Sequence, residues 1–262
     1  MRYYIVDAFT DRLFKGNQAG VCLLDEWLDT DLMQTIAAEN RLAETAFVVP
    51  RGTHYDLRWF TPEVEFDLCG HATLASAFVI ANFVDKGAEV IRFETMSGTL
   101  TVTKKGDFYE MDFPARAPSP IAISSLMEEA LGVRVLEAHQ SRDLMLLVED
   151  EETVRTLAPR MELVAQIPEA SVGLIVTAKG SSCDFVSRYF SPITDAAAPE
   201  DPVTGSAHCT LIPFWRERLN KREMLARQLS KRGGTLFCED RGERVKIAGY
   251  AMLYLEGTIR TG

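Results

Sequence analysis

Residues 200–209, EDPVTGSAHC, bring together side chains that can transfer a proton or bind an anion. The uncharged run after Asp201 predicts a buried helix near the Thr-Gly-Ser turn, with Ser206 in its first turn. A helix N-terminus carries free backbone N–H groups and a partial positive charge. The turn therefore predicts a carboxylate site formed by Ser206 and by the N–H groups of Gly205 and Ala207. Asp201 can orient a ligand amine or hydrogen-bond a base. The structural alternatives are an N-cap serine and a turn aspartate.

A second turn of the same kind lies at residues 67–72, DLCGHA. His71 follows Gly70 and opens a run that is apolar on every face up to Val84, which predicts an enclosed helix. We expect the helix dipole to favour a neutral His71, able to donate or accept a hydrogen bond near pH 7. The N–H groups at Gly70 and Ala72 can bind an anion in the same way. A capping or packing histidine is the structural alternative.

Glu44 is the acid best suited to carbon chemistry. In residues 42–49, LAETAFVV, it is the only acidic residue and stands at the start of an apolar strand. A carboxylate partly removed from water at a strand end can serve as the base or acid for a carbon-bound proton. A solvated loop glutamate is the structural alternative.

The two turns belong to a longer internal repeat. Residues 58–62, RWFTP, match residues 188–192, RYFSP, at an offset of 130. Asp67 then aligns with Asp201, and at the following glycine the offset has grown to 135, so the second copy contains five extra loop residues. Two matched blocks in the same order indicate a duplicated molecule.

The repeat predicts two pseudo-symmetric lobes. Residues 114–120, PARAPSP, hold three prolines in seven positions and form the predicted linker. We expect an N-terminal lobe of residues 1–117 and a C-terminal lobe of residues 118–262, with the last strand free to return to the N-terminal lobe. Each lobe is expected to direct a helix N-terminus into a shared cleft.

Short apolar and alternating runs predict more strand than helix, and the fold class is α+β. Helices are predicted at 29–40, 71–84, 122–131, 151–166, 220–231 and 206–215, the last interrupted by Pro213. Strands are predicted at 3–9, 21–24, 46–49, 55–60, 63–68, 90–95, 99–104, 108–113, 143–149, 172–177, 184–190, 234–238 and 243–256.

Composition restricts the class of partner. A formal net charge of −10 disfavours nucleic acid, and the longest uncharged apolar run, residues 68–84, is too short and too polar to span a membrane. Five irregularly spaced cysteines and an N-terminus without signal-peptide features predict a cytoplasmic protein. Metal-ligand and nucleotide motifs are lacking, so we expect neither metal nor cofactor. His208 and Cys209 are expected in the core.

These motifs together resemble the phenazine-biosynthesis PhzF-like family, within the diaminopimelate epimerase-like fold. The matching segments span most of the chain. They are DAFT at 7–10, FKGNQAGV at 14–21, LAETAF at 42–47, RWFTP at 58–62, DLCGHATL at 67–74, SGTL at 97–100, MDFPA at 111–115, RYFSP at 188–192 and EDPVTGSAH at 200–208.

The resemblance implies two lobes, each a bent, mostly antiparallel sheet or open barrel around a central helix, with the active site between them. It also implies a cofactor-free isomerase that is usually a homodimer. In such an enzyme Glu44 would move a proton between carbons of a small carboxylate, supported by His71, Asp201 and Ser206. Asn17, in the matched FKGNQAGV segment, is expected to contact the substrate.

The sequence departs from related patterns at two places. Gln18 replaces a proline that is common in the family, which affects the local loop. Epimerases and racemases of this fold use two cysteines, one before each helix-turn glycine. Here Cys69 occupies the first of these positions and Thr204 the second, which disfavours a symmetric two-thiol mechanism. An isomerase of a small carboxylate is therefore favoured. An amino-acid epimerase or racemase and a non-catalytic metabolite-binding protein remain alternatives.

Overall fold

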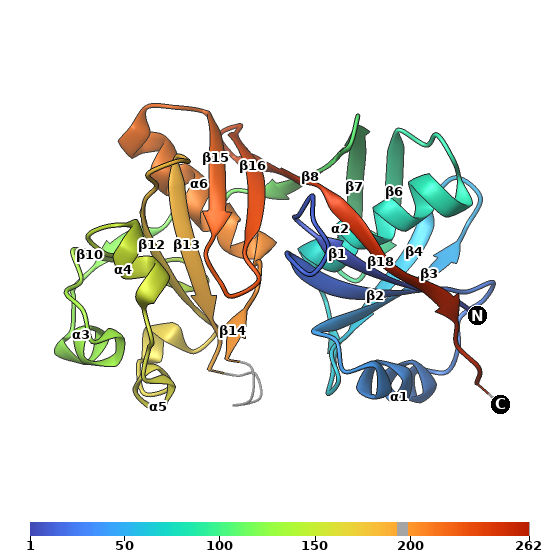
Figure 1. The fold of residues 1–262 in the computed structure, drawn as a ribbon, viewed down its shortest axis with the longest axis horizontal. Helices are drawn as coiled ribbons and strands as arrows, with labels where there is room; N and C mark the ends of the chain where they lie inside the picture. Colours follow the sequence, from blue (N-terminus) through green and yellow to red (C-terminus); the bar gives the residue numbers. More distant parts are fainter. Residues whose placement is uncertain (193–198, 262) are drawn as a thin grey trace. The chain divides into compact units, whose positions relative to one another are not determined.

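Strands β8 (Phe108–Pro114) and β17 (Arg244–Gly249) carry the chain between two units of structure. The structure is a computed structural model that describes residues 1–192 and 199–261 (Figure 1). Unit 1 comprises Met1–Asp112 and Ala248–Gly262, and unit 2 comprises Phe113–Ile247. Unit 2 is thus inserted in the chain between two parts of unit 1, and the last strand belongs to unit 1.

Unit 1 is a mostly antiparallel sheet with one helix on each of its faces. Its two parallel pairings are β2–β3 and β4–β6. Its elements are β1 (Arg2–Ala8), β2 (Asn17–Leu23), α1 (Thr30–Asn40), β3 (Glu44–Pro50), β4 (Tyr55–Phe60), β5 (Glu65–Phe66), α2 (Gly70–Val79), β6 (Val90–Thr95), β7 (Gly98–Lys105), β8 and β18 (Ala251–Thr258).

Unit 2 is built on the same plan. Its parallel pairings are β11–β12 and β13–β15. Its elements are β9 (Ser119–Ile121), α3 (Ser125–Leu131), β10 (Glu137–Gln140), β11 (Leu144–Leu147), α4 (Glu151–Thr156), α5 (Met161–Val164), a 3₁₀ turn (Pro168–Ala170), β12 (Leu174–Lys179), β13 (Phe185–Phe190), β14 (Glu200–Asp201), α6 (Gly205–Leu219), β15 (Glu223–Gln228), β16 (Gly234–Asp240) and β17.

The strand register confirms the duplication. Phe60 pairs with Thr45 on one side and Glu65 on the other. Phe190, at the same place in the repeated motif, pairs with Leu174 and Glu200. The order of antiparallel and parallel pairings from β1 to β7 recurs from β10 to β16. The predicted α+β fold of two pseudo-symmetric lobes is confirmed.

The repeated motifs share an ion pair as well as a register. Arg58 donates from two guanidinium nitrogens to the two carboxylate oxygens of Glu65, at 2.6 and 2.7 Å. Arg188 donates in the same bidentate manner to Glu200, at 2.6 and 3.0 Å. Each guanidinium also lies over the phenylalanine ring two residues later in its motif, 5.2 and 4.9 Å from the ring centre. The fork geometry of arginine suits such a paired contact and fixes the return strand in both units.

Helix α2 is enclosed by its own sheet, as the apolar sequence predicts. It contacts β1, β2, β3, β7 and β18, and it continues beyond Val79 as a π-helical turn, Ile80–Val84. Helix α1 lies on the other side of β2 and β3 (Figure 1). None of the helices in the described ranges is long and apolar enough to cross a membrane.

Helix α6 is not interrupted at its proline, in contrast to the sequence prediction. It runs for 15 residues through Pro213 to Leu219. A proline cannot donate to the carbonyl four residues earlier, which here is that of Cys209. That carbonyl instead accepts a hydrogen bond from the backbone N–H of Arg116, at 2.9 Å. The linker segment thus supplies the donor that the proline lacks.

Other sequence predictions were wrong in length or type. Residues 220–231 are predicted to be helical, but they contain strand β15, where sheet pairing overrides the helix propensity of residues such as Glu223 and Leu225. The helix expected at 151–166 is two short helices separated by a segment containing Pro159. The strand expected at 63–68 covers only Glu65–Phe66.

The repeat also needs a one-residue correction. Tyr189 pairs with Asp201, whereas Trp59, its counterpart, pairs with Phe66. Asp201 therefore corresponds to Phe66 and not to Asp67. With this alignment each helix begins four residues after the matched position, at Gly70 and at Gly205.

His208 in α6 makes the fold sensitive to acid. It has no exposed surface, and its Nδ1 lies 2.8 Å from the carbonyl oxygen of Thr204. Burial lowers the pKa of His208 from 6.5 to about 4, and the bond to Thr204 opposes this only in part. Because the unfolded chain binds this proton more readily, the contribution of His208 to stability is full above pH 6.5 and is lost as the pH falls towards 4.

We expect the wild-type protein to lose about 2 kcal/mol more unfolding free energy between pH 7.5 and pH 5 than His208→Gln, which cannot titrate. Denaturant unfolding at the two pH values measures the difference. His54→Gln, a half-buried site, serves as the control and should behave like the wild type. Equal losses in the wild type and His208→Gln would contradict the prediction.

Candidate active site

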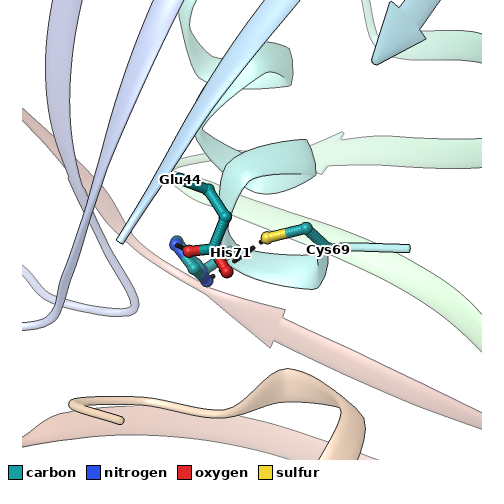
Figure 2. A group of neighbouring side chains, drawn as sticks. All are labelled: Glu44, Cys69 and His71. Atoms are coloured by element: carbon teal, nitrogen blue, oxygen red, sulfur yellow. Dashed lines mark hydrogen bonds and ion pairs between the residues drawn. The ribbon is translucent and has the colours of Figure 1, made fainter. Parts of the chain in front are cut away.

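A glutamate and a histidine meet in unit 1 (Figure 2). Glu44 is the first residue of β3 and His71 the second of α2. Glu44 Oε2 lies 3.0 Å from His71 Nε2, with side-chain exposures of 18% and 6%. Among the described residues neither atom has a hydrogen-bond partner of good geometry. The pair is therefore held by charge, and the carboxylate is not fixed by a directional bond to the ring.

The other ring nitrogen of His71 has two neighbours. The side-chain nitrogen of Asn17 lies 3.2 Å from Nδ1, and Cys69 Sγ lies 3.5 Å from it. Asn17 is the first residue of β2 and is 1% exposed. An amide side chain can present either an N–H donor or an oxygen acceptor. Asn17 can thus serve either protonation state of His71.

His71 favours its charged form, which overturns the expectation of a neutral ring. Burial lowers the pKa of His71, but the neighbouring Cys69 and Glu44 raise it, and the net pKa lies well above the ordinary value of histidine. Burial, with a further effect from Glu44, raises the pKa of the Cys69 thiol. The helix dipole, which disfavours a positive charge at this end, is a weaker effect than the carboxylate at 3.0 Å.

The turn before α2 leaves backbone donors available. Cys69 has extended backbone geometry and stands at the N-cap without a side-chain capping bond. Its carbonyl accepts from the N–H and the hydroxyl of Thr73, at 3.2 and 2.6 Å. The N–H groups of Gly70 and His71 precede the first intrahelical donor and have no partner within the helix, and the N–H of Ala72 donates to the Cys69 sulfur. This is the geometry expected of an anion-binding helix start.

The turn before α6 has the same form and a different set of side chains. Thr204 stands at the N-cap in place of Cys69, with Gly205, Ser206 and Ala207 after it. The Thr204 hydroxyl donates to Asp201 Oδ2 at 2.5 Å. Asp201 and Ser206 are both half-buried. The residues predicted for this turn, Asp201, Gly205, Ser206 and Ala207, therefore lie at or just before the start of α6.

Gln228 is a residue of this site that the sequence did not reveal. It ends β15, within a stretch that had been expected to be helical, and is 1% exposed. Its oxygen accepts from the Thr204 backbone N–H at 2.8 Å. Its nitrogen donates to the Asp201 carbonyl at 2.7 Å and to the Thr204 hydroxyl at 3.2 Å. A strand from elsewhere in unit 2 thus fixes the turn that carries Asp201.

Glu44, Cys69 and His71 also form a group of possible metal ligands. Their donor atoms lie within 4.8 Å of one another. A histidine offers only one ring nitrogen to an ion, yet here the carboxylate approaches Nε2 while the thiol approaches Nδ1. The arrangement therefore suits a chain of proton donors and acceptors better than a shared ion.

The fold of two repeated sheets, each with a buried helix that begins at an open turn, defines the diaminopimelate epimerase-like class. Residues 6–257 match the family described as phenazine biosynthesis-like protein, and the chain belongs to that family.

Two close relatives illustrate the match. A phenazine biosynthesis protein of the PhzF family from Enterococcus faecalis has a crystal structure that superimposes with a TM-score of 0.96, at 49% identity over 99% of both chains. An uncharacterized isomerase of Pseudomonas aeruginosa is 50% identical over 97% of this chain and 96% of its own length.

A more distant structure shares the fold alone. A hydroxyproline epimerase from Agrobacterium vitis, with bound trans-4-hydroxy-L-proline, has a TM-score of 0.64 at 11% identity over 98% and 91% of the two chains. Family membership together with the isomerase relative of Pseudomonas aeruginosa supports an isomerase role.

The dependence of His71 on Glu44 can be measured directly. In Glu44→Gln the carboxylate charge is removed while the shape is kept, so we expect the pKa of His71 to fall. Nitrogen-15 NMR of the histidine side chains during a pH titration reports this shift. The resonances of His54 and His139 provide internal references. An unchanged His71 titration would show that the carboxylate does not control its charge.

Proposed function

We propose that the protein is a cofactor-independent isomerase of a small carboxylate, in which Glu44 moves a proton between two carbons of the substrate. The observation that carries the proposal is the contact of Glu44 with the buried imidazole of His71 at the start of α2, with one carboxylate oxygen 3.0 Å from the ring nitrogen. A general base of this kind must be partly shielded from water and free to reach a ligand.

Each residue has a separate task in this proposal. Glu44 accepts the proton as a carbon–hydrogen bond breaks, and the electron pair enters a conjugated system of the substrate. Glu44 then returns the proton to a second carbon, so the reaction is redox-neutral. His71 balances the charge on Glu44 and donates a hydrogen bond to the developing anion. Asn17 holds the imidazole in place.

Carboxylate binding is assigned to the backbone N–H groups of the helix turns. Gly70 and Ala72 supply them in unit 1, and Gly205 and Ala207 in unit 2. Ser206 adds a hydroxyl donor. Asp201, which accepts from Thr204 at 2.5 Å, is assigned to a polar substituent of a bound ligand. The homodimer and the cytoplasmic location remain predictions from the sequence.

Amino-acid epimerisation or racemisation is the second candidate. It is favoured by Cys69, whose thiol stands at the N-cap of α2 and 3.5 Å from His71 Nδ1. It is disfavoured by Thr204, which holds the equivalent N-cap of α6 and does not supply a second thiol. A ligand-binding protein without catalysis is the third possibility, and a ligand that binds without proton exchange would support it.

Solvent exchange distinguishes these functions. A panel of small cyclic and amino carboxylates is incubated with the protein in deuterated water, and NMR follows deuterium incorporation into carbon positions. Glu44→Gln should retain binding and lose about 10²–10⁴-fold in rate, because the proton acceptor is removed. Glu39→Gln, an exposed acid on α1, is the matched control.

Cys69→Ala separates the two enzymatic candidates. A proton shift by Glu44 leaves measurable exchange in this variant, whereas an epimerase that uses the thiol loses exchange at the α-carbon. Near-normal rates in Glu44→Gln would refute the proposed isomerase.

A further inference from the structure

The strand register identifies the residue of unit 2 that stands where Glu44 stands in unit 1. The phenylalanines of the two repeated motifs pair with Thr45 in unit 1 and with Leu174 in unit 2. The residues immediately before these are Glu44 and Gly173. Unit 2 therefore has a glycine at the position of the carboxylate.

The space beside this glycine is occupied by a hydroxyl group. A Cβ atom built on Gly173 would lie 2.0 Å from Tyr189 Oη, so the tyrosine excludes any side chain at this position. Tyr189 pairs with Ile175 of β12, so the two side chains lie on the same face of the sheet. Thr177, two residues after Ile175 in β12, lies on that face as well and accepts a hydrogen bond from Trp215 of α6. The alternation of side chains along a strand places the hydroxyl on the face of the sheet that carries α6. Glu44 has the same relation to α2, where it meets His71.

The hydroxyl of Tyr189 is held by a buried acid. It donates to Asp143 Oδ1 at 3.0 Å, and the two residues are 9% and 1% exposed. Burial, followed by the charge of Asp143, raises the pKa of Tyr189, which keeps the phenol neutral. Burial raises the pKa of Asp143, and the bond from Tyr189 and the charges of Arg142 and Arg116 oppose that rise. A phenol that donates to a carboxylate still has an oxygen lone pair to offer.

We propose that Tyr189 is a substrate-binding residue, and that its hydroxyl oxygen accepts a hydrogen bond from an N–H or O–H group of the ligand while Asp143 holds the tyrosine in position. The inference rests on the proposed function, because it assigns to unit 2 the ligand-facing place that Glu44 has in unit 1. At this position of the repeat, unit 1 has the Glu44 carboxylate and unit 2 has a neutral hydroxyl acceptor. The protein would then prefer substrates that present an N–H or O–H group to the Tyr189 hydroxyl.

The test compares ligands that differ by one donor. Isothermal titration calorimetry measures the binding of benzoate and of 2-, 3- and 4-aminobenzoate to the full-length protein. The wild type should bind at least one aminobenzoate about tenfold more tightly than benzoate, as a hydrogen bond to a buried acceptor gives. Tyr189→Phe should lose that preference and keep its affinity for benzoate. Asp143→Asn should reduce the preference without removing it.

A second buried tyrosine provides the matched control. Tyr109 in unit 1 is 2% exposed, and its hydroxyl lies 2.8 Å from the side-chain nitrogen of Asn82. Tyr109→Phe loses a comparable internal hydrogen bond and should keep the wild-type preference. The proposal is overturned if no aminobenzoate is preferred over benzoate, or if the preference survives in Tyr189→Phe. Failure of the proposed isomerase is seen separately, as normal deuterium exchange in Glu44→Gln.

Discussion

The approach of a carboxylate to an imidazole at the start of a buried helix is the constraint on which the candidate site depends. Glu44 and His71 come from a strand and a helix that are 27 residues apart in the chain, and their contact at 3.0 Å requires both elements to be fixed. The enclosed α2 and the β2–β3 pairing supply that rigidity. Removal of the carboxylate would leave the buried His71 without its charged partner. The site and the core of unit 1 are therefore one structure.

Much of this arrangement could be read from the sequence, because its signals were local. The uniformly apolar run after His71 predicted an enclosed helix, and the repeated RWFTP and RYFSP segments predicted the duplication. Long-range contacts were the part that could not be read. Gln228 reaches the α6 turn from a strand whose residues all favour helix, and nothing in its own neighbourhood indicates that pairing. The charge of His71 was misjudged for the same reason, since Glu44 is distant in sequence.

The two copies share their framework contacts but differ in the side chains at their helix starts. The arginine–glutamate fork that fixes the return strand is present in both units. At the helix starts, however, Cys69 and His71 correspond to Thr204 and Ser206. Framework contacts determine where backbone groups lie, so changing them would disturb both strand and turn. The side chains at the helix starts take part in none of the strand pairings, so the two copies can differ there and keep the same register.

The insertion of unit 2 between two parts of unit 1 bears on how the chain acquires its structure during synthesis. All residues of unit 2 have been made once Ile247 is added, and they are contiguous in the chain. The N-terminal part of unit 1 is made before unit 2, but its strand β1 pairs with β18, which is made after unit 2. Until then β1 presents an unpaired edge, the kind of surface that joins other chains. The sheet of unit 1 can thus be completed only after all of unit 2 has been synthesised.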